Sequence, residues 1–126
     1  MTVGQVMHTM AAYAAVDQLA LQRCGSCGTV QYPPRELCVV CLADTLEWRV
    51  TDTEPGEVLA HTVLHHSHEP AFNAMLPLRV GLVRLDAGPT VVCFLADGCC
   101  AGTHVSVAAR LDGEGRTVLH AVCEAS

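Results

Sequence analysis

The chain has 126 residues, a net charge of −6, and 51% hydrophobic against 4% aromatic residues. This length allows one small domain or two very small modules, so Val, Leu and Ala must supply most of the packing. Affinity for nucleic acids rests largely on Lys and Arg neutralising phosphates. Seven such residues, with no cluster, therefore argue against a DNA or RNA partner.

The sequence carries no sign of a membrane or secretory protein. Residues 1–15 lack the basic start, apolar run and cleavage site of a signal peptide. No apolar run approaches the ~18 residues that a membrane span needs. We therefore expect a cytoplasmic protein without a membrane partner. In that reducing compartment, paired cysteines bind metal more often than they form a disulfide scaffold.

An amphipathic helix is the first predicted element, within a first segment of residues 1–18. Apolar side chains between residues 2 and 16 recur at helical spacing and fall on one face. This face can pack on the chain's own core or dock onto a partner, and the sequence leaves both uses open. The face comprises Val3, Val6, Met7, Met10, Tyr13 and Ala14.

Four cysteines dominate the second segment, residues 19–50. Cys24 and Cys27 form one Cys-x-x-Cys turn, and Cys38 and Cys41 form another after ten intervening residues. Two such turns on facing hairpins aim four sulfurs at one point, which is the tetrahedral geometry of thiolate-bound zinc. The sequence therefore predicts one structural Zn²⁺ in a small ribbon. Its strands are expected at residues 19–23, 30–32 and 46–50.

A four-thiolate site leaves no open coordination position, so this metal is expected to support folding and not to activate water. Iron in a rubredoxin-like electron carrier is the alternative metal. Rubredoxins are rich in aromatic residues around the iron, whereas only Tyr32 and Trp48 are near in this sequence. A thioredoxin-like dithiol would need a Cys-x-x-Cys turn that opens a helix in a βαβ unit, and no such unit is indicated.

Four further cysteines lie outside this pattern. Cys93 occupies an apolar run and reads as a buried small hydrophobe. Cys99 and Cys100 are adjacent, so a bridge between them would strain the disulfide geometry. A second metal site made by these three residues and Cys123 is conceivable, although its spacing matches no common pattern.

The third segment, residues 51–126, contains five β-like runs separated by turn signals. Five strands with short turns favour a small closed barrel, and an OB-fold is the commonest five-stranded choice. The expected fold is therefore mostly β: an N-terminal helix, a rubredoxin-like zinc ribbon and an OB-fold-like barrel. The runs are residues 57–65, 78–86, 90–96, 104–111 and 116–123.

Catalytic motifs are not evident in this chain. There is no nucleophile elbow, phosphate loop or dinucleotide fingerprint. His65, His66 and His68 could bind metal or shuttle protons, but a solvated or interface loop is the favoured interpretation. We therefore expect no catalysis by this chain alone.

The arrangement resembles the bacterial and archaeal zinc-ribbon/OB-fold accessory proteins that partner thiolase-like enzymes. The resemblance covers roughly residues 19–111. Two departures are the short last part of the barrel and the Cys99-Cys100 pair. The stretches that carry the resemblance are residues 21–28, 32–35 with 38–41, 46–48, 56–63, and 82–86 with 88–89.

This resemblance implies a role in reactions of CoA thioesters. Family members associate with thiolases, sterol-carrier-type thiolases or ketosynthase-like enzymes, which catalyse thiolysis, retro-aldol cleavage or acyl transfer. The catalytic residues then lie in the partner, which also binds most of the CoA thioester. The accessory chain supports the partner and shapes entry to its CoA site. A hetero-oligomer of two plus two chains is the natural expectation.

The expected partner interface is the loop of residues 65–76. Its apolar residues lie in a region that should be on the surface, and exposed apolar groups often mark interfaces. Alternatively, the loop folds back over the barrel mouth. The interface residues expected are His65, His66, Phe72, Met75 and Leu76; the basic residues considered for a CoA phosphate are Arg35, Arg79 and Arg84.

Two other functions compete with the accessory role. Zinc ribbons and OB-folds also bind nucleic acids, but single-strand binders need basic grooves and aromatic stacking platforms. The acidic charge and the scarcity of aromatic residues disfavour that alternative. An independent enzyme or electron carrier is the third hypothesis, which turnover without a partner or visible colour would support.

Overall fold

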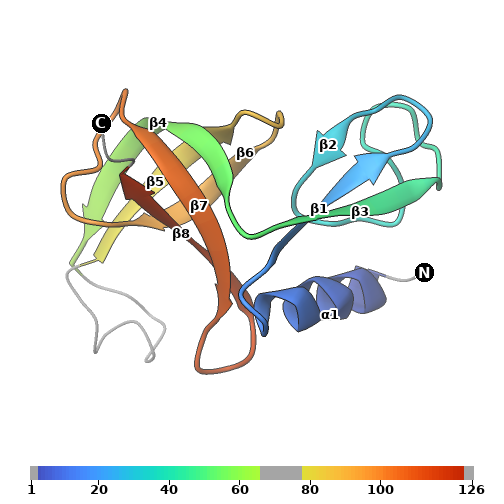
Figure 1. Ribbon diagram of the computed structural model, residues 1–126, viewed down its shortest axis with the longest axis horizontal. Coiled ribbons are helices and arrows are strands. Elements are labelled where there is room, and N and C mark those ends of the chain that lie inside the picture. Colours follow the sequence, from blue (N-terminus) through green and yellow to red (C-terminus); the bar gives the residue numbers. More distant parts are fainter. Residues whose placement is uncertain (1–2, 66–77, 124–126) are drawn as a thin grey trace.

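A computed structural model of the chain describes residues 3–65 and 78–123. Among these, one helix and eight strands form a three-stranded sheet and a closed barrel that lie side by side (Figure 1). The elements are α1 (Val3–Ala14), β1 (Leu19–Cys24), β2 (Val30–Gln31), β3 (Leu46–Thr51), β4 (Glu54–Leu64), β5 (Leu78–Leu85), β6 (Thr90–Leu95), β7 (His104–Leu111) and β8 (Thr117–Cys123).

The helix α1 buries one face against the chain's own strands. Val6, Met10 and Ala14, spaced four residues apart, are each at most 2% exposed, whereas Met7 on the same predicted face is 41% exposed. The helix packs against β1 and also contacts β7 and β8. The apolar face of α1 therefore packs on the chain's own core.

The ribbon sheet has the strand order β2-β1-β3, with both pairs antiparallel. The central strand β1 is buried along most of its length because the helix covers it and its neighbours pair with it. Cys24 is the last residue of β1 and lies opposite Leu46 of β3. The sheet therefore fixes the first metal-ligand candidate on a strand end.

The barrel closes in the order β4-β5-β6-β8-β7. Neighbouring strands are antiparallel except for β6 and β8, which pair in parallel at Phe94 with His120 and at Leu95 with Ala121. Gly81 on β5 marks a close approach, because a Cβ there would lie 2.6 Å from Leu95 Cδ1 and 2.8 Å from the Ala60 carbonyl oxygen.

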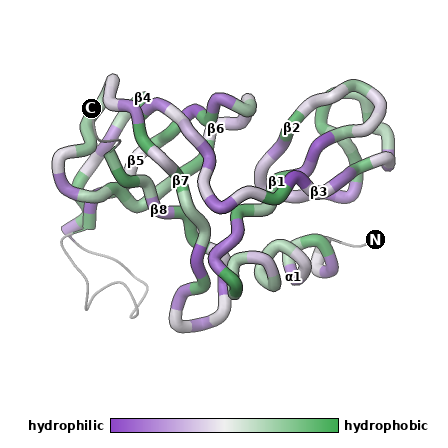
Figure 2. Tube along the Cα trace, in the orientation of Figure 1, coloured by the Kyte–Doolittle hydropathy of each residue, from purple (hydrophilic) through white to green (hydrophobic). Residues whose placement is uncertain are grey.

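Ribbon and barrel share one hydrophobic core. Leu19 and Leu21 of β1 and Ala14 of α1 belong to the same buried cluster as the inward-facing residues of the barrel, and Tyr32 packs against it. Figure 2 shows apolar stretches on α1 and on strands of both sheets. Burial, with a smaller contribution from Cys93, raises the pKa of Tyr32 to about 12.

The predicted mostly-β architecture is confirmed, and all eight predicted strands are present within the described residues. The first barrel strand was placed wrongly at its start: β4 begins at Glu54 and not at residue 57, because Glu54 pairs with Val107 of β7 and Pro55 with Ser106. No helix in residues 3–65 or 78–123 is long and apolar enough to cross a bilayer.

Candidate metal centre

Two tight turns bring the four predicted cysteines together. The first knuckle (residues 24–29) follows β1, and the second knuckle (residues 37–43) lies between β2 and β3. The four sulfur atoms lie within 4.8 Å of one another. Cys24 Sγ is 3.5 Å from Cys41 Sγ, and Cys27 Sγ is 3.6 Å from Cys38 Sγ.

These separations fit a tetrahedral four-thiolate metal. Zinc–sulfur bonds of about 2.3 Å place the sulfurs of such a site about 3.8 Å apart. Cys24 and Cys38 are buried, whereas Cys27 and Cys41 are exposed, so an ion can reach the cluster from one side. Because four sulfurs fill all positions of a tetrahedron, a bound zinc ion would carry no water for catalysis.

Backbone amides support the sulfurs within each knuckle. The N–H groups of Ser26 and Cys27 donate to Cys24 Sγ at 3.4 and 3.5 Å. In the second knuckle the N–H of Val40 donates to Cys38 Sγ at 3.4 Å. Such bonds favour the thiolate over the thiol, which is the form that binds metal.

Backbone amides and neighbouring thiols shift the pKa values of these cysteines in opposite directions. The hydrogen bond from the Cys27 N–H lowers the pKa of Cys24 to about 6. The pKa of Cys41 is raised to about 12, because its neighbouring thiols, Cys24 first, and burial outweigh the lowering effect of the Ala43 N–H. Four negative sulfurs at this distance repel one another, and a dication removes that repulsion. The donor set is therefore suited to a divalent metal ion.

Comparison with known proteins places the whole arrangement in a family. Residues 12–47 match the family model "ChsH2, rubredoxin-like zinc ribbon domain". Residues 48–110 match the model "ChsH2, C-terminal OB-fold domain". The chain belongs to the ChsH2 family.

Two curated relatives match part of the chain. One is a "Probable enoyl-CoA hydratase alpha subunit" of Thermomonospora curvata, 34% identical over 76 residues, which are 60% of this chain and 23% of the relative. The other is a "DUF35 domain-containing scaffold protein" of Methanocaldococcus jannaschii, 28% identical over 75 residues, which are 60% of this chain and 52% of the relative. The match thus spans about a quarter and about half of these proteins.

Two solved structures are similar over nearly the whole chain. The "Ltp2-ChsH2(DUF35) aldolase" matches with a TM-score of 0.73 and 26% identity, covering 92% of both chains. A DUF35-family protein of unknown function from Sulfolobus solfataricus matches with a TM-score of 0.61 and 13% identity, covering 97% of this chain and 85% of the other. The second likeness shows a shared fold alone.

Two glutamines in this ChsH2-family chain escaped the sequence analysis. Gln22 on β1 and Gln31 on β2 are buried behind the second knuckle and hydrogen-bond to each other. Gln22 is the one polar residue in the otherwise apolar start of β1, residues 19–22. This exception to the apolar pattern could have indicated a buried polar contact.

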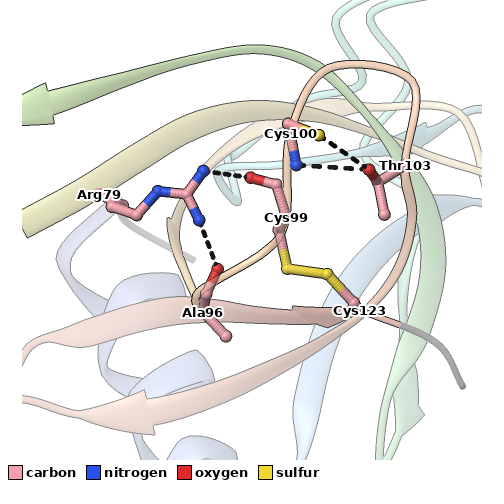
Figure 3. Close-up of a disulfide and its surroundings, with 6 residues drawn as sticks. All are labelled: Arg79, Ala96, Cys99, Cys100, Thr103 and Cys123. Atoms are coloured by element: carbon pink, nitrogen blue, oxygen red, sulfur yellow. Dashed lines mark hydrogen bonds between the residues drawn. A yellow bond between two sulfur atoms is a disulfide. The ribbon is translucent and has the colours of Figure 1, made fainter.

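A disulfide joins Cys99, in the turn after β6, to Cys123 at the end of β8 (Figure 3). The two Cα atoms are 5.6 Å apart, within the usual range for a disulfide. The pairing could not be predicted from the sequence, because 24 positions separate the two cysteines. The disulfide leaves no second metal site made by Cys93, Cys99, Cys100 and Cys123, which the spacing already disfavoured. Cys93 is buried among apolar residues, as expected, and burial raises its pKa to about 12.

Arg79 of β5 fixes the turn that carries this disulfide. Its guanidinium donates to the carbonyl oxygens of Ala96 and Cys99 at 2.8 and 2.6 Å (Figure 3). The other two basic residues considered for a CoA phosphate, Arg84 and Arg35, have contacts elsewhere in the fold. Arg84 forms a 3.9 Å ion pair with Glu57, and the main chain of Arg35 is bonded to Gln22 in the ribbon.

The predicted interface loop lies mostly outside the described residues. His65 is exposed just after β4. His66, Phe72, Met75 and Leu76 fall in residues 66–77, so their assignment to an interface stays a prediction. The expected cytoplasmic location likewise stays a prediction.

Exposed apolar side chains gather at two places that the structure describes. One is the second knuckle, and the other is the outer face of β4, β5 and β6, where a depression of 280 Å³ is lined almost entirely by apolar atoms. Apolar groups of this kind often mark protein interfaces. The exposed residues are Leu37, Val39, Val40 and Leu42 on the knuckle and Leu59, Leu82 and Val92 on the sheet face.

Proposed function

We propose that the chain is a zinc-binding, non-catalytic accessory subunit of a thiolase-like enzyme complex that acts on acyl-CoA thioesters. The observation that carries the proposal is the likeness of nearly the whole chain, at 26% identity, to a structure described as an Ltp2-ChsH2(DUF35) aldolase. The two curated relatives, one named as a probable subunit of an enoyl-CoA hydratase and the other as a scaffold protein, support it.

The metal has a structural role in this proposal. Cys24, Cys27, Cys38 and Cys41 hold one Zn²⁺, and their sulfur separations support this assignment. A bound zinc ion supplies folding free energy, because a ribbon of this size has few core residues of its own. Zinc binding thereby holds β1 in place, and β1 contributes Leu19 and Leu21 to the core of the barrel.

The partner carries the chemistry. A closed four-thiolate site offers no position for a reacting group, so the metal of this chain takes no part in catalysis. Retro-aldol cleavage of a carbon–carbon bond in an acyl-CoA is the reaction best supported, because the aldolase structure matches over 92% of both chains. We retain the two-plus-two stoichiometry as part of the proposal.

The exposed apolar groups of the described surface support association. The knuckle residues Val40 and Leu42 are 67% and 69% exposed, and Leu42 holds a positive φ of 63° that non-glycine residues adopt infrequently. The positive φ belongs to the knuckle turn, because Gly28 has the same kind of φ at the equivalent place in the first knuckle. The exposure of these apolar side chains is what supports a covering partner.

Affinity purification of the tagged chain from extracts of its native cells, followed by mass spectrometry, tests the assembly. The proposal predicts a thiolase-fold protein in near-equal amount. A Cys38→Ser/Cys41→Ser variant is the matched control and should lose the partner with its zinc. Recovery of nucleic acid without a thiolase-fold protein would contradict the proposal and revive the nucleic-acid alternative.

A further inference from the structure

Two buried glutamines link the ribbon sheet to the second knuckle. Gln22 and Gln31 are directly opposite each other in the register of β1 and β2, and they are only 3% and 5% exposed. Gln31 Nε2 donates to Gln22 Oε1 at 2.9 Å. A buried side-chain amide destabilises the fold unless its N–H and C=O groups form hydrogen bonds. The other hydrogen bonds of the two glutamines therefore show which part of the chain they hold.

Gln22 acts on the segment that leads into the second knuckle. Its Oε1 accepts from the N–H of Arg35 at 2.7 Å, and its Nε2 donates to the carbonyl of Arg35 at 2.9 Å. One side-chain amide thus pairs with both polar groups of one residue, as a residue of a neighbouring strand would. The segment is held to the sheet although it is not itself a strand.

Gln31 acts on the ligand residue Cys38. Its Nε2 donates to the carbonyl oxygen of Leu37 at 3.2 Å, and its Oε1 accepts from the N–H of Val39 at 2.9 Å. These two groups belong to the two peptide units that flank Cys38. By holding both peptide planes, Gln31 restricts the φ and ψ of Cys38 and therefore the direction of its Cα–Cβ bond.

The first knuckle is positioned differently. Cys24 is part of β1 and pairs with β3, and its N–H donates to the carbonyl of Thr29 at 2.8 Å. The backbone hydrogen bonds of the second knuckle, from Cys38 N–H to the Ala43 carbonyl and from Leu42 N–H to the Cys38 carbonyl, stay within the knuckle. In the part of the chain that the structure describes, the other hydrogen bonds from the ribbon strands to the second knuckle, besides the contact between Cys24 Sγ and Cys41 Sγ, come from Gln31.

We propose that the Gln22–Gln31 amide pair is the positioning element of the metal centre. It holds Cys38 in its ligand orientation before the ion arrives, and it thereby sets the affinity for zinc. This inference rests on the zinc ligation proposed above. Groups that orient metal ligands typically contribute about 10- to 100-fold to metal affinity, and a preorganised site avoids ordering the loop when the ion binds.

Zinc affinity of the full chain, measured by competition with a chromophoric chelator, tests the proposal. Gln31→Leu should lower the affinity about 10- to 100-fold. Gln22→Leu should lower it less, since Gln31 keeps its two bonds to the knuckle. The control is Leu85→Ala, a barrel-core variant that lowers stability without touching either knuckle, and it should leave the affinity within about threefold of wild type.

Cobalt substitution separates loss of affinity from loss of ligands. Saturated with Co²⁺, the wild type and Gln31→Leu should show the same tetrahedral four-thiolate absorption, because the ligands are unchanged and only their preorganisation is lost. Equal zinc affinity of Gln31→Leu and wild type would overturn the proposal. An affinity loss in Leu85→Ala as large as that in Gln31→Leu would also overturn it, since general stability would then explain both.

A measurement on the metal-free wild type covers the case in which Gln31→Leu fails to fold. The proposal predicts that the backbone amide of Val39 stays protected from hydrogen exchange after zinc is removed, while the amides of exposed turns exchange. Exchange of Val39 at the rate of an unstructured chain would overturn it. If the wild type binds no zinc, the metal part of the proposed function fails; if all variants bind zinc equally, only this inference fails.

Discussion

Glu54 and Arg49 form an ion pair at the junction between the ribbon and the barrel. The carboxylate of Glu54, at the start of β4, is 1% exposed and accepts from Arg49 Nε at 3.1 Å and from Nη2 at 3.3 Å. The hydroxyl of Thr51 donates to the same carboxylate at 3.0 Å. Three donors from the end of β3 thus satisfy one buried carboxylate on β4, and they fix the direction in which the chain leaves the ribbon.

Glu54→Ala should lower the free energy of unfolding by about 1–3 kcal/mol, because it removes the three hydrogen bonds by which the end of β3 is held to β4, two of them from a charged guanidinium. Urea unfolding followed by circular dichroism measures this loss. The control is Glu57→Ala, whose exposed partner Arg84 is 3.9 Å away, and it should cost less than about 1 kcal/mol. Equal losses in the two variants would show that the junction pair has no special role.

The Cys99–Cys123 disulfide makes a prediction about thiol content. The chain has eight cysteines, and six of those described are free thiols. Alkylation of the denatured, metal-free protein should therefore label six cysteines without reductant and eight with it. Labelling of all eight without reductant would contradict the pairing.

The same disulfide should stabilise the barrel. A closed loop with a sequence separation of 24 residues gives about 3 kcal/mol in the chain-entropy account. Cys123→Ser, compared with the exposed control Cys100→Ser, should lose most of this free energy of unfolding under oxidising conditions. Reduction of the wild type should bring it to the level of Cys123→Ser, and identical stability of the two serine variants would argue against the bridge.

His120 on β8 makes stability depend on pH. Burial lowers its pKa from the ordinary value of 6.5, and the positive charge of Arg110 lowers it further. The unfolded chain therefore binds the proton more readily than the folded one, so stability falls as the pH drops below about 6.5.

The urea midpoint should accordingly fall less between pH 7.5 and pH 5.5 for His120→Gln than for the wild type. His61→Gln, at an exposed position on β4, is the control and should retain the wild-type dependence. A parallel pH dependence in all three proteins would show that His120 does not contribute.

Removal of the metal should disturb the ribbon first. Trp48, the single tryptophan, lies on β3 with its ring centroid 6.2 Å from that of Tyr13 on α1. Chelation should lower the urea midpoint of the ribbon, followed by the fluorescence of Trp48, and added zinc should restore it. An unchanged midpoint in protein shown to be metal-free would mean that zinc contributes nothing to the stability of the ribbon.

Much of the fold could be predicted from the sequence because its signals are local. Alternating apolar residues and Gly or Asp turns located the barrel strands, and the two Cys-x-x-Cys turns located the cluster of four cysteines that could hold a metal ion. The start of β4 was missed because Glu54-Pro55-Gly56 has the composition of a loop. Only the pairing with β7 and the burial of Glu54 reveal it as strand.

The features that escaped prediction depend on contacts between distant residues. Cys99 and Cys123 are brought together by the parallel pairing of β6 with β8, which no local pattern indicates. The Gln22–Gln31 pair depends on the register of two strands and on a segment folding behind them. Glutamine is common on protein surfaces, so composition alone gives no reason to place it in a core.

Turnover of an acyl-CoA substrate by the chain alone, by the co-purified partner alone and by the reconstituted complex tests the central claim most directly. The accessory-subunit account predicts no turnover by the chain, and full turnover only when the partner is joined by zinc-loaded chain. Turnover by the chain alone, or a partner whose folding and activity are the same without it, would contradict the account.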